Sequence, residues 1–178
     1  MREGVEQLKR WTGKARATIV FDTTVDLFTH DGLFNKVKGK QDVAVIGFTT
    51  DGDVFGGFYS VAATKQCQWF FWDPNIFVFS FESHGRCMTP QRFVPKEELK
   101  RRARVKFWKS NKSGFVWFGV DLCGGFYLGH ERSKSCCLNK SRAIEGLEDT
   151  TPTESHNRNL KKPPSTTAPA LSQFSLSD

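Results

Sequence analysis

Two apolar runs on either side of a tight turn constrain the fold of this chain most strongly. The runs are VAVIGFTT (43–50) and VFGGFYSV (54–61), and Asp51-Gly52 lies between them. An Asp-Gly pair flanked by apolar segments is the strongest short-range signal of a β-hairpin. Both runs are short and the first is rich in β-branched residues, which favours buried strands over helices. The sequence therefore predicts a hairpin at residues 43–61.

The paired glycines Gly56 and Gly57 raise an alternative, a phosphate-binding loop. Such a loop needs a helix directly after its glycines, and usually a lysine placed to reach the phosphates. Here FYSVAAT follows, with neither feature. A glycine inside a strand instead marks a bulge or the close approach of another backbone. We therefore expect Gly56 and Gly57 to lie in mid-strand.

Further short apolar segments predict a mainly β chain with minor α content. Strands are expected at ATIVFDTT, IFVFSFES, RVKFWKS, GFVWFGV and GGFYLGHE, and short helices at 1–13, around 33–37 and from Pro95. In IFVFSFES, Phe77 and Phe79 alternate with Ile76 and Val78, so both faces of that strand should be covered. Six or seven short strands with few helices predict a two-sheet antiparallel β-sandwich with short flanking helices.

Composition divides the chain into three parts. We expect residues 1–14 to form a short amphipathic helix with a glycine stop, and residues 15–151 to form the sandwich domain. The segment 152–178 is polar and holds four of the seven prolines. This composition is typical of a disordered tail.

Bulk features indicate the compartment. No apolar run reaches the roughly 18 to 20 residues that cross a bilayer, and the N-terminal segment has no apolar core of a signal peptide. The five cysteines are an odd number without regular spacing, which indicates reduced thiols and a cytoplasmic location. Vicinal Cys136 and Cys137 are candidate redox thiols; the alternative is an ordinary half-buried pair.

No constellation of catalytic residues is evident. No serine or cysteine has the surroundings of an activated nucleophile. His84 and Cys87 have the spacing of one metal-ligand pair, but a second convincing pair is missing. We expect a non-enzymatic protein without a metal or cofactor.

The segment 96–112 carries most of the excess positive charge, since it contributes +6 (eight Lys and Arg, two Glu) to a net +7. Its candidate partner-facing residues are Lys100, Arg101, Arg102, Arg104 and Lys106. Three interpretations stay open: a solvated face, a docking patch for an acidic protein, or, with Phe107, Trp108 and Trp117, a surface for single-stranded nucleic acid.

The order of IVFDTTVD, VAVIGFTTDGDVFGGFYS, NIFVFSF and GFVWFGVDLCGGFYLGHERSKSC resembles the TLDc domain over roughly residues 15–150. The residues that match the family pattern are Asp22, Asp51, Gly52, Val54, Phe55, Gly56, Gly57, Phe77, Phe79, Gly124, Gly125 and Gly129. The resemblance implies an antiparallel two-sheet sandwich without an established catalytic site. It also implies protection against oxidative damage and binding to the vacuolar proton-pumping ATPase.

Two segments depart from that family. KSNKSG precedes the late strand where many members are richer in glycine. The family ends in an apolar strand that completes a sheet, whereas PPSTTAPALSQ stands here. Adjacent prolines cannot donate to a strand ladder. We therefore expect the final strand to be missing or replaced, leaving a weakened domain or an open sheet edge.

Overall fold

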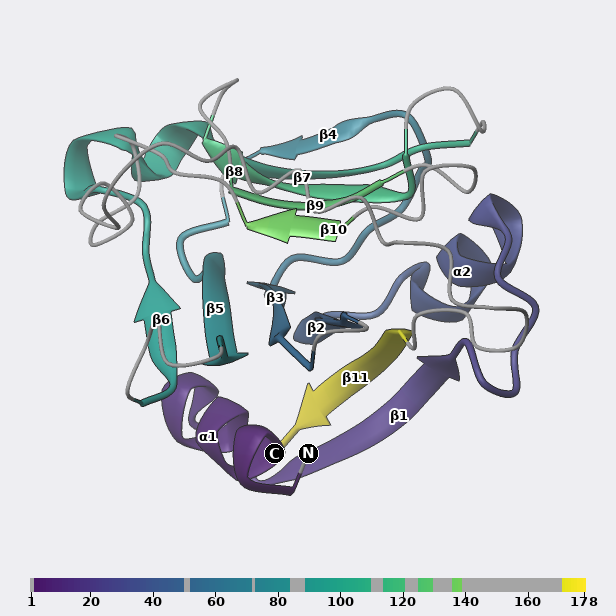
Figure 1. Cartoon of the computed structure of the whole chain (residues 1–178). Helices are drawn as coiled ribbons and strands as arrows, with labels where there is room; N and C mark the ends of the chain where they lie inside the picture. Colours follow the sequence, from purple (N-terminus) through teal and green to yellow (C-terminus); the bar gives the residue numbers. More distant parts are fainter. Residues whose placement is uncertain are drawn as a thin grey trace.

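Two antiparallel sheets pack face to face in this chain. The computed structural model describes residues 2–49, 52–71, 73–83, 89–109, 114–120, 125–129, 136–138 and 171–178. Figure 1 shows the two sheets one above the other, with helix α1 against the lower one. The predicted mainly β, sandwich-like fold is confirmed.

The larger sheet has six strands in the order β1-β11-β2-β3-β5-β6. Their bounds are Arg16–Asp22 (β1), Leu171–Ser177 (β11), Val43–Phe48 (β2), Val54–Tyr59 (β3), Phe77–Glu82 (β5) and Gln91–Phe93 (β6). The smaller sheet has the order β10-β9-β8-β7-β4. Its strands are Cys136–Leu138 (β10), Gly125–Leu128 (β9), Val116–Val120 (β8), Ala103–Phe107 (β7) and Trp69–Phe71 (β4).

Three helical segments accompany the sheets: α1 at Arg2–Thr12, α2 at His30–Val37 and the 3-10 helix η1 at Glu97–Arg102. In α2 the buried residues are His30, Leu33, Phe34 and Val37, so the predicted helix around 33–37 is confirmed. The expected helix start at Pro95 is wrong. Lys96 is the N-cap of η1, because Pro95 is held in an extended bridge before it.

The predicted hairpin is confirmed as β2–β3. Val45 lies opposite Gly57, and Ile46 lies opposite Gly56, so both glycines are in mid-strand. At the turn, the Thr49 backbone N–H donates to the Asp53 carbonyl, and the Gly52 N–H donates back to Thr49. Gly52 has a φ of 87°, a conformation that glycine adopts without steric cost.

Gly57 permits the two sheets to approach closely. A Cβ atom built there would lie 2.7 Å from the ring of Phe118 on β8. Phe118 is fully buried between the sheets, with Phe55, Tyr59 and Phe126 in the same cluster. The missing side chain on one sheet therefore makes room for a large ring from the other.

The outer face of the six-stranded sheet is covered by α1. Leu8 is fully buried in a second cluster with Ala44, Ile46, Phe58, Phe77, Phe79 and Leu176. Trp11 stacks on Phe81, with ring centroids 5.8 Å apart and planes 16° apart. Since Ile76 and Val78 face the inter-sheet core, both faces of β5 are covered, as predicted.

The C-terminal strand β11 corrects the prediction for the end of the chain. Residues 171–177 form a strand between β1 and β2, so the expectation of a disordered tail is wrong for these residues. Of the two alternatives expected for the final strand, missing or replaced, the missing strand is wrong. Residues 152–170 lie outside the described residues. The last proline is Pro169, so the seven residues of β11 keep every backbone N–H needed for a ladder. Because the composition of residues 152–178 is polar as a whole, it gave no indication of this short strand.

We predict that Leu176→Ala lowers the free energy of unfolding by about 2–5 kcal/mol, the usual loss for a buried leucine. Leu176 is only 3% exposed, and it joins α1 to the sheet. Urea unfolding followed by fluorescence measures the change. The control is the exposed neighbour Ser177→Ala, which should stay within about 0.5 kcal/mol of the original chain. Equal midpoints for both variants would contradict the placement of β11.

A second prediction concerns Gly57→Ala, whose added methyl group would clash with Phe118. We expect a loss of about 1–3 kcal/mol, the usual cost of overpacking a core. Phe118→Leu supplies the matched background, because a smaller side chain there should relieve the clash. Urea unfolding of both single variants and the double variant then forms a cycle. Strictly additive losses would show that the two side chains do not meet.

Candidate interaction surface

The residues of the family pattern lie at turns and packing contacts. Val54 and Phe55 begin β3, and Phe77 and Phe79 lie on β5 under α1. Gly125 has a φ of 144°, and a Cβ there would lie 2.0 Å from the Phe118 carbonyl oxygen. Gly129 is buried directly after β9. Asp51 and Gly124 lie outside the described residues.

Asp22 organises the turn after β1. Its Oδ1 accepts hydrogen bonds from the Thr24 N–H at 2.9 Å and the Thr24 hydroxyl at 2.8 Å. The Asp22 N–H donates to Asp26 Oδ2 at 2.9 Å, and Lys36 Nζ lies 3.0 Å from Asp26 Oδ1. The Asp22 N–H, and then Lys36, lower the pKa of Asp26, because both stabilise its ionised form. These carboxylates are engaged in turn formation.

A buried acid, Asp73, fixes the end of β3. Its carboxylate accepts from the Ser60 N–H, from the Ser60 hydroxyl at 2.6 Å and from the Asn75 N–H at 3.0 Å. Tyr59 next to it is 2% exposed, and burial, helped by the charge of Asp73, raises the pKa of its phenol. Tyr59 therefore stays neutral at physiological pH, and Asp73 is committed to binding backbone and hydroxyl groups.

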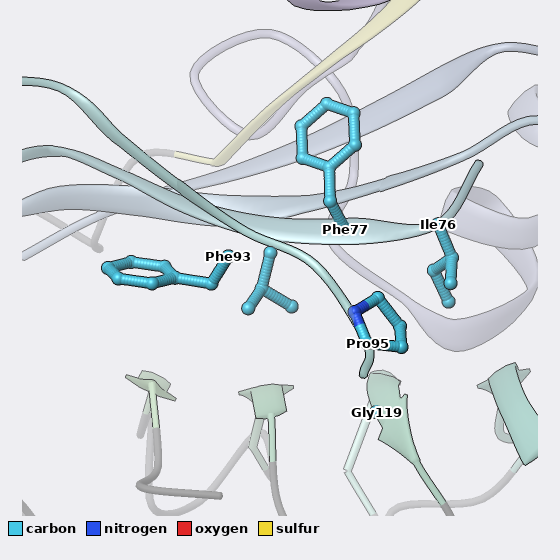
Figure 2. Close-up of a pocket in the computed structure, with 6 residues that line it drawn as sticks. Ile76, Phe77, Phe93, Pro95 and Gly119 are labelled. Carbon is cyan, nitrogen blue, oxygen red and sulfur yellow. The ribbon is translucent and has the colours of Figure 1, made fainter. Parts of the chain in front are cut away.

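Figure 2 shows a cavity between the sheets, lined by Ile76, Phe77, Val78, Phe93, Pro95 and Gly119. Ile76 and Pro95 point toward the strand that carries Gly119, whereas the ring of Phe77 points to the opposite side of its strand. The volume is about 10 Å³, which is the lower limit for a single water molecule. Its size and apolar lining exclude this cavity as a substrate site.

Metal-ligating residues do not gather in the part of the chain that the structure describes. No three His, Cys, Asp or Glu side chains among those residues form a group that could hold a metal ion. His84, Cys87, Cys123 and His130 lie outside the described residues. His30 is buried, stacks on Phe115 at 4.1 Å and places Nε2 2.9 Å from the Gly114 carbonyl oxygen. It thereby joins α2 to the start of β8.

The outer face of the five-stranded sheet combines cations with aromatic rings. Along β7, Val105 and Phe107 are buried, whereas Arg104 and Lys106 are half-buried on the opposite face. Lys106 lies directly opposite Trp117 on β8, and Trp117 lies directly opposite Tyr127 on β9. The strands β7, β8 and β9 are neighbours in the smaller sheet (Figure 1). Their register therefore aligns one ammonium group and two rings across the three strands.

The side chains of this face contact one another. The Arg104 guanidinium carbon lies 6.0 Å from the ring centroid of Trp117, and Lys106 Nζ lies 5.7 Å from that of Trp108. Trp108 in turn meets Tyr127 edge to face at 6.0 Å. We call these five residues, Arg104, Lys106, Trp108, Trp117 and Tyr127, the cation–aromatic face.

Other predicted partner-facing residues lie on η1, directly before β7. Arg101 and Arg102 are exposed, and Lys100 forms an ion pair with Glu97. The expectation that Phe107 belongs to a stacking surface is wrong: Phe107 is 1% exposed and packs against Phe34 in the core. Sequence reasoning missed Tyr127. The alternation in GFYL nevertheless indicates that Tyr127 points to the other face of its strand from Phe126 and Leu128.

The candidate thiols lie at the edge of the same sheet. Cys136 and Cys137 belong to β10, where Cys136 pairs with Leu128 and Cys137 with Tyr127. Their redox role stays a prediction. Cys67 is exposed and lies outside the strands.

Comparisons with known protein families and with curated proteins found no match for this chain. None of the helices in the described residues is long and apolar enough to cross a membrane.

The lowered pKa of Asp26 yields a prediction about acid stability. A carboxyl group with a lower pKa in the folded state contributes stability above its unfolded pKa of about 3.9, and this contribution is lost as pH falls through the folded value. We expect Asp26→Asn to lower the free energy of unfolding at pH 7, and the difference between the variant and the original chain to shrink below pH 4. Urea unfolding of both chains from pH 2 to pH 7 measures this difference. If it does not change with pH, the contribution of Asp26 to stability does not come from its ionised form.

Proposed function

We propose that this chain is a non-enzymatic protein-interaction module of the TLDc type, which acts in the cytoplasm in oxidative-stress protection or in regulation of the vacuolar proton-pumping ATPase. The resemblance over residues 15–150 supports this, and a two-sheet antiparallel fold is what it implies. The partner would be an acidic protein surface, such as one on the pump's cytosolic subunits.

The observation that carries the proposal is the cation–aromatic face. Arg, Trp and Tyr are the residues that dominate binding energy at protein interfaces, because they combine large contact areas with few rotatable bonds or a planar charged group. Here Arg104 lies against Trp117, and Lys106 lies against Trp108, which meets Tyr127, so these side chains already have neighbours that restrict their rotamers before a partner binds. This lowers the entropy cost of association. The adjacent Arg101 and Arg102 add charge that would steer an acidic partner.

The second candidate is single-stranded nucleic acid. Trp117 and Tyr127 on neighbouring strands could stack bases, with Arg104 and Lys106 next to phosphates. Two consequences distinguish nucleic acid from protein. Affinity for nucleic acid falls steeply with salt, since each phosphate contact releases counterions. It also does not require a shape-matched partner.

A charge-reversal pair tests the face. We predict that Arg104→Glu with Lys106→Glu weakens binding to purified cytosolic pump subunits at least tenfold. The matched control, Lys38→Glu with Lys40→Glu, makes the same change in net charge at exposed residues at the end of α2 and should bind like the original chain. Titration calorimetry or surface plasmon resonance measures the affinities.

Equal affinities for the two variants would overturn the role of the face. No binding of pump subunits by the original chain would overturn the partner. A labelled oligothymidylate is titrated in parallel. Tight binding that is lost both in 0.5 M salt and in the face variant would replace the protein partner with nucleic acid.

A further inference from the structure

The C-terminal strand β11 occupies a slot whose walls come from the other end of the chain. It pairs with β1 on one side and with β2 on the other, antiparallel in both cases. In the described sheet β1 pairs with β11 and with no other strand, so β11 is what joins β1 to the sheet. The slot therefore has hydrogen-bonding strand edges on both sides.

The groups that fix β11 in its slot belong to a contiguous N-terminal segment. The Leu176 N–H donates to the Asp42 carbonyl at 2.8 Å. Lys14 Nζ lies 3.0 Å from Asp178 Oδ1 and 3.3 Å from Asp42 Oδ2, and so connects both sides of the slot. Leu176 packs in the cluster with Leu8, Ala44 and Ile46. The hydrogen-bond and ion-pair partners of this strand lie within residues 2–48, and the cluster around Leu176 also includes Phe58, Phe77 and Phe79.

The connection between β11 and the preceding strand is long. Residues 139–170, 32 in number, separate Leu138 at the end of β10 from Leu171. An extended chain spans at most about 3.3–3.6 Å per residue, so the connection has a maximum reach of roughly 100 Å. A compact chain of this size has a radius of gyration of about 16 Å. Covalent geometry therefore allows β11 to reach the slot of a neighbouring molecule.

We propose that β11 is an exchangeable strand, and that two copies of this chain form a dimer by placing each β11 in the β1–β2 slot of the other. Every contact of β11 with residues 2–48 is reproduced in the exchanged form, because the receiving segment is identical in both copies. The two forms differ mainly in the entropy of the connection. Such exchange is a low-cost route to a symmetric dimer. The proposal is independent of the proposed function of the cation–aromatic face.

Concentration decides between the two forms. A tethered segment has an effective concentration of the order of millimolar, so the closed monomer should prevail in dilute solution. Unfolding and refolding at roughly millimolar protein should instead trap exchanged dimers. Light scattering coupled to gel filtration separates monomer from dimer. A chain that refolds only as monomer under these conditions would overturn the proposal.

Cysteine cross-linking identifies the strand that is exchanged. Thr18 on β1 lies directly opposite Ser175 on β11. Directly opposed strand residues have the separation that a disulfide requires. One full-length chain carries Thr18→Cys and another carries Ser175→Cys, and the two are mixed, unfolded, refolded together and oxidised. Mass spectrometry of the peptide that joins residues 18 and 175 distinguishes this bond from those of the five native cysteines.

We expect the joined peptide in the dimer fraction of the mixture, at least tenfold above a collision control that pairs Thr18→Cys with Lys65→Cys, an exposed residue after β3. A chain with both Thr18→Cys and Ser175→Cys, refolded at low concentration, should form the bond within one molecule and confirms the geometry. The proposal is wrong if that chain forms its bond but the amount of joined peptide in the mixture does not exceed that in the collision control. A dimer that lacks the 18–175 bond would also overturn it.

Discussion

The packing of Phe118 over Gly57 is the contact on which the two-sheet arrangement depends. Sheets that pack face to face stand about 10 Å apart, a space that interdigitating side chains must fill without overlap. Here phenylalanine rings are a large part of the buried cluster between the sheets, and a ring opposite an ordinary side chain would force the sheets apart. Gly57 on one sheet and the ring of Phe118 on the other solve this locally. The backbone carbonyl of Phe118 also lies so close to Gly125 that a Cβ atom would not fit there. The absence of a side chain at Gly125 therefore permits the close approach of β9 to β8 at this place.

Two features of this core bear on where a ligand could bind. The cavity beside Ile76 and Gly119 has space for no more than about one water molecule, and the buried acid Asp73 accepts hydrogen bonds from hydroxyl and amide groups. Helix α1 packs on the outer face of the larger sheet, whereas the half-buried side chains of the cation–aromatic face lie on the outer face of the smaller sheet. The partner proposed above would bind there, on the side of β7, β8 and β9 that faces away from the core.

Local signals in the sequence predicted the local parts of this structure. Asp51-Gly52 between two apolar runs was sufficient for the β2–β3 hairpin, and the apolar residues on both faces of IFVFSFES predicted that both faces of β5 are covered. The cation–aromatic face was only partly predictable, because it depends on the register of three strands. Trp117 and Lys106 are opposite each other only through the β7–β8 pairing. Phe107 was expected in the stacking surface, but it is 1% exposed and belongs to the core.

The strand β11 was not predictable for a different reason. Its seven residues hold few apolar side chains, and an isolated segment of this kind has little tendency to form a strand. The strand forms because β1 and β2 offer unpaired edges on both sides, which is a property of the distant N-terminal segment. A strand specified mainly by its slot is also one that another copy can supply. Because the slot and the cation–aromatic face lie on different sheets, an exchanged dimer would carry two intact faces. A repetitive acidic partner would then bind the dimer more tightly than the monomer without any new contact, since the second face binds at the effective concentration set by the first.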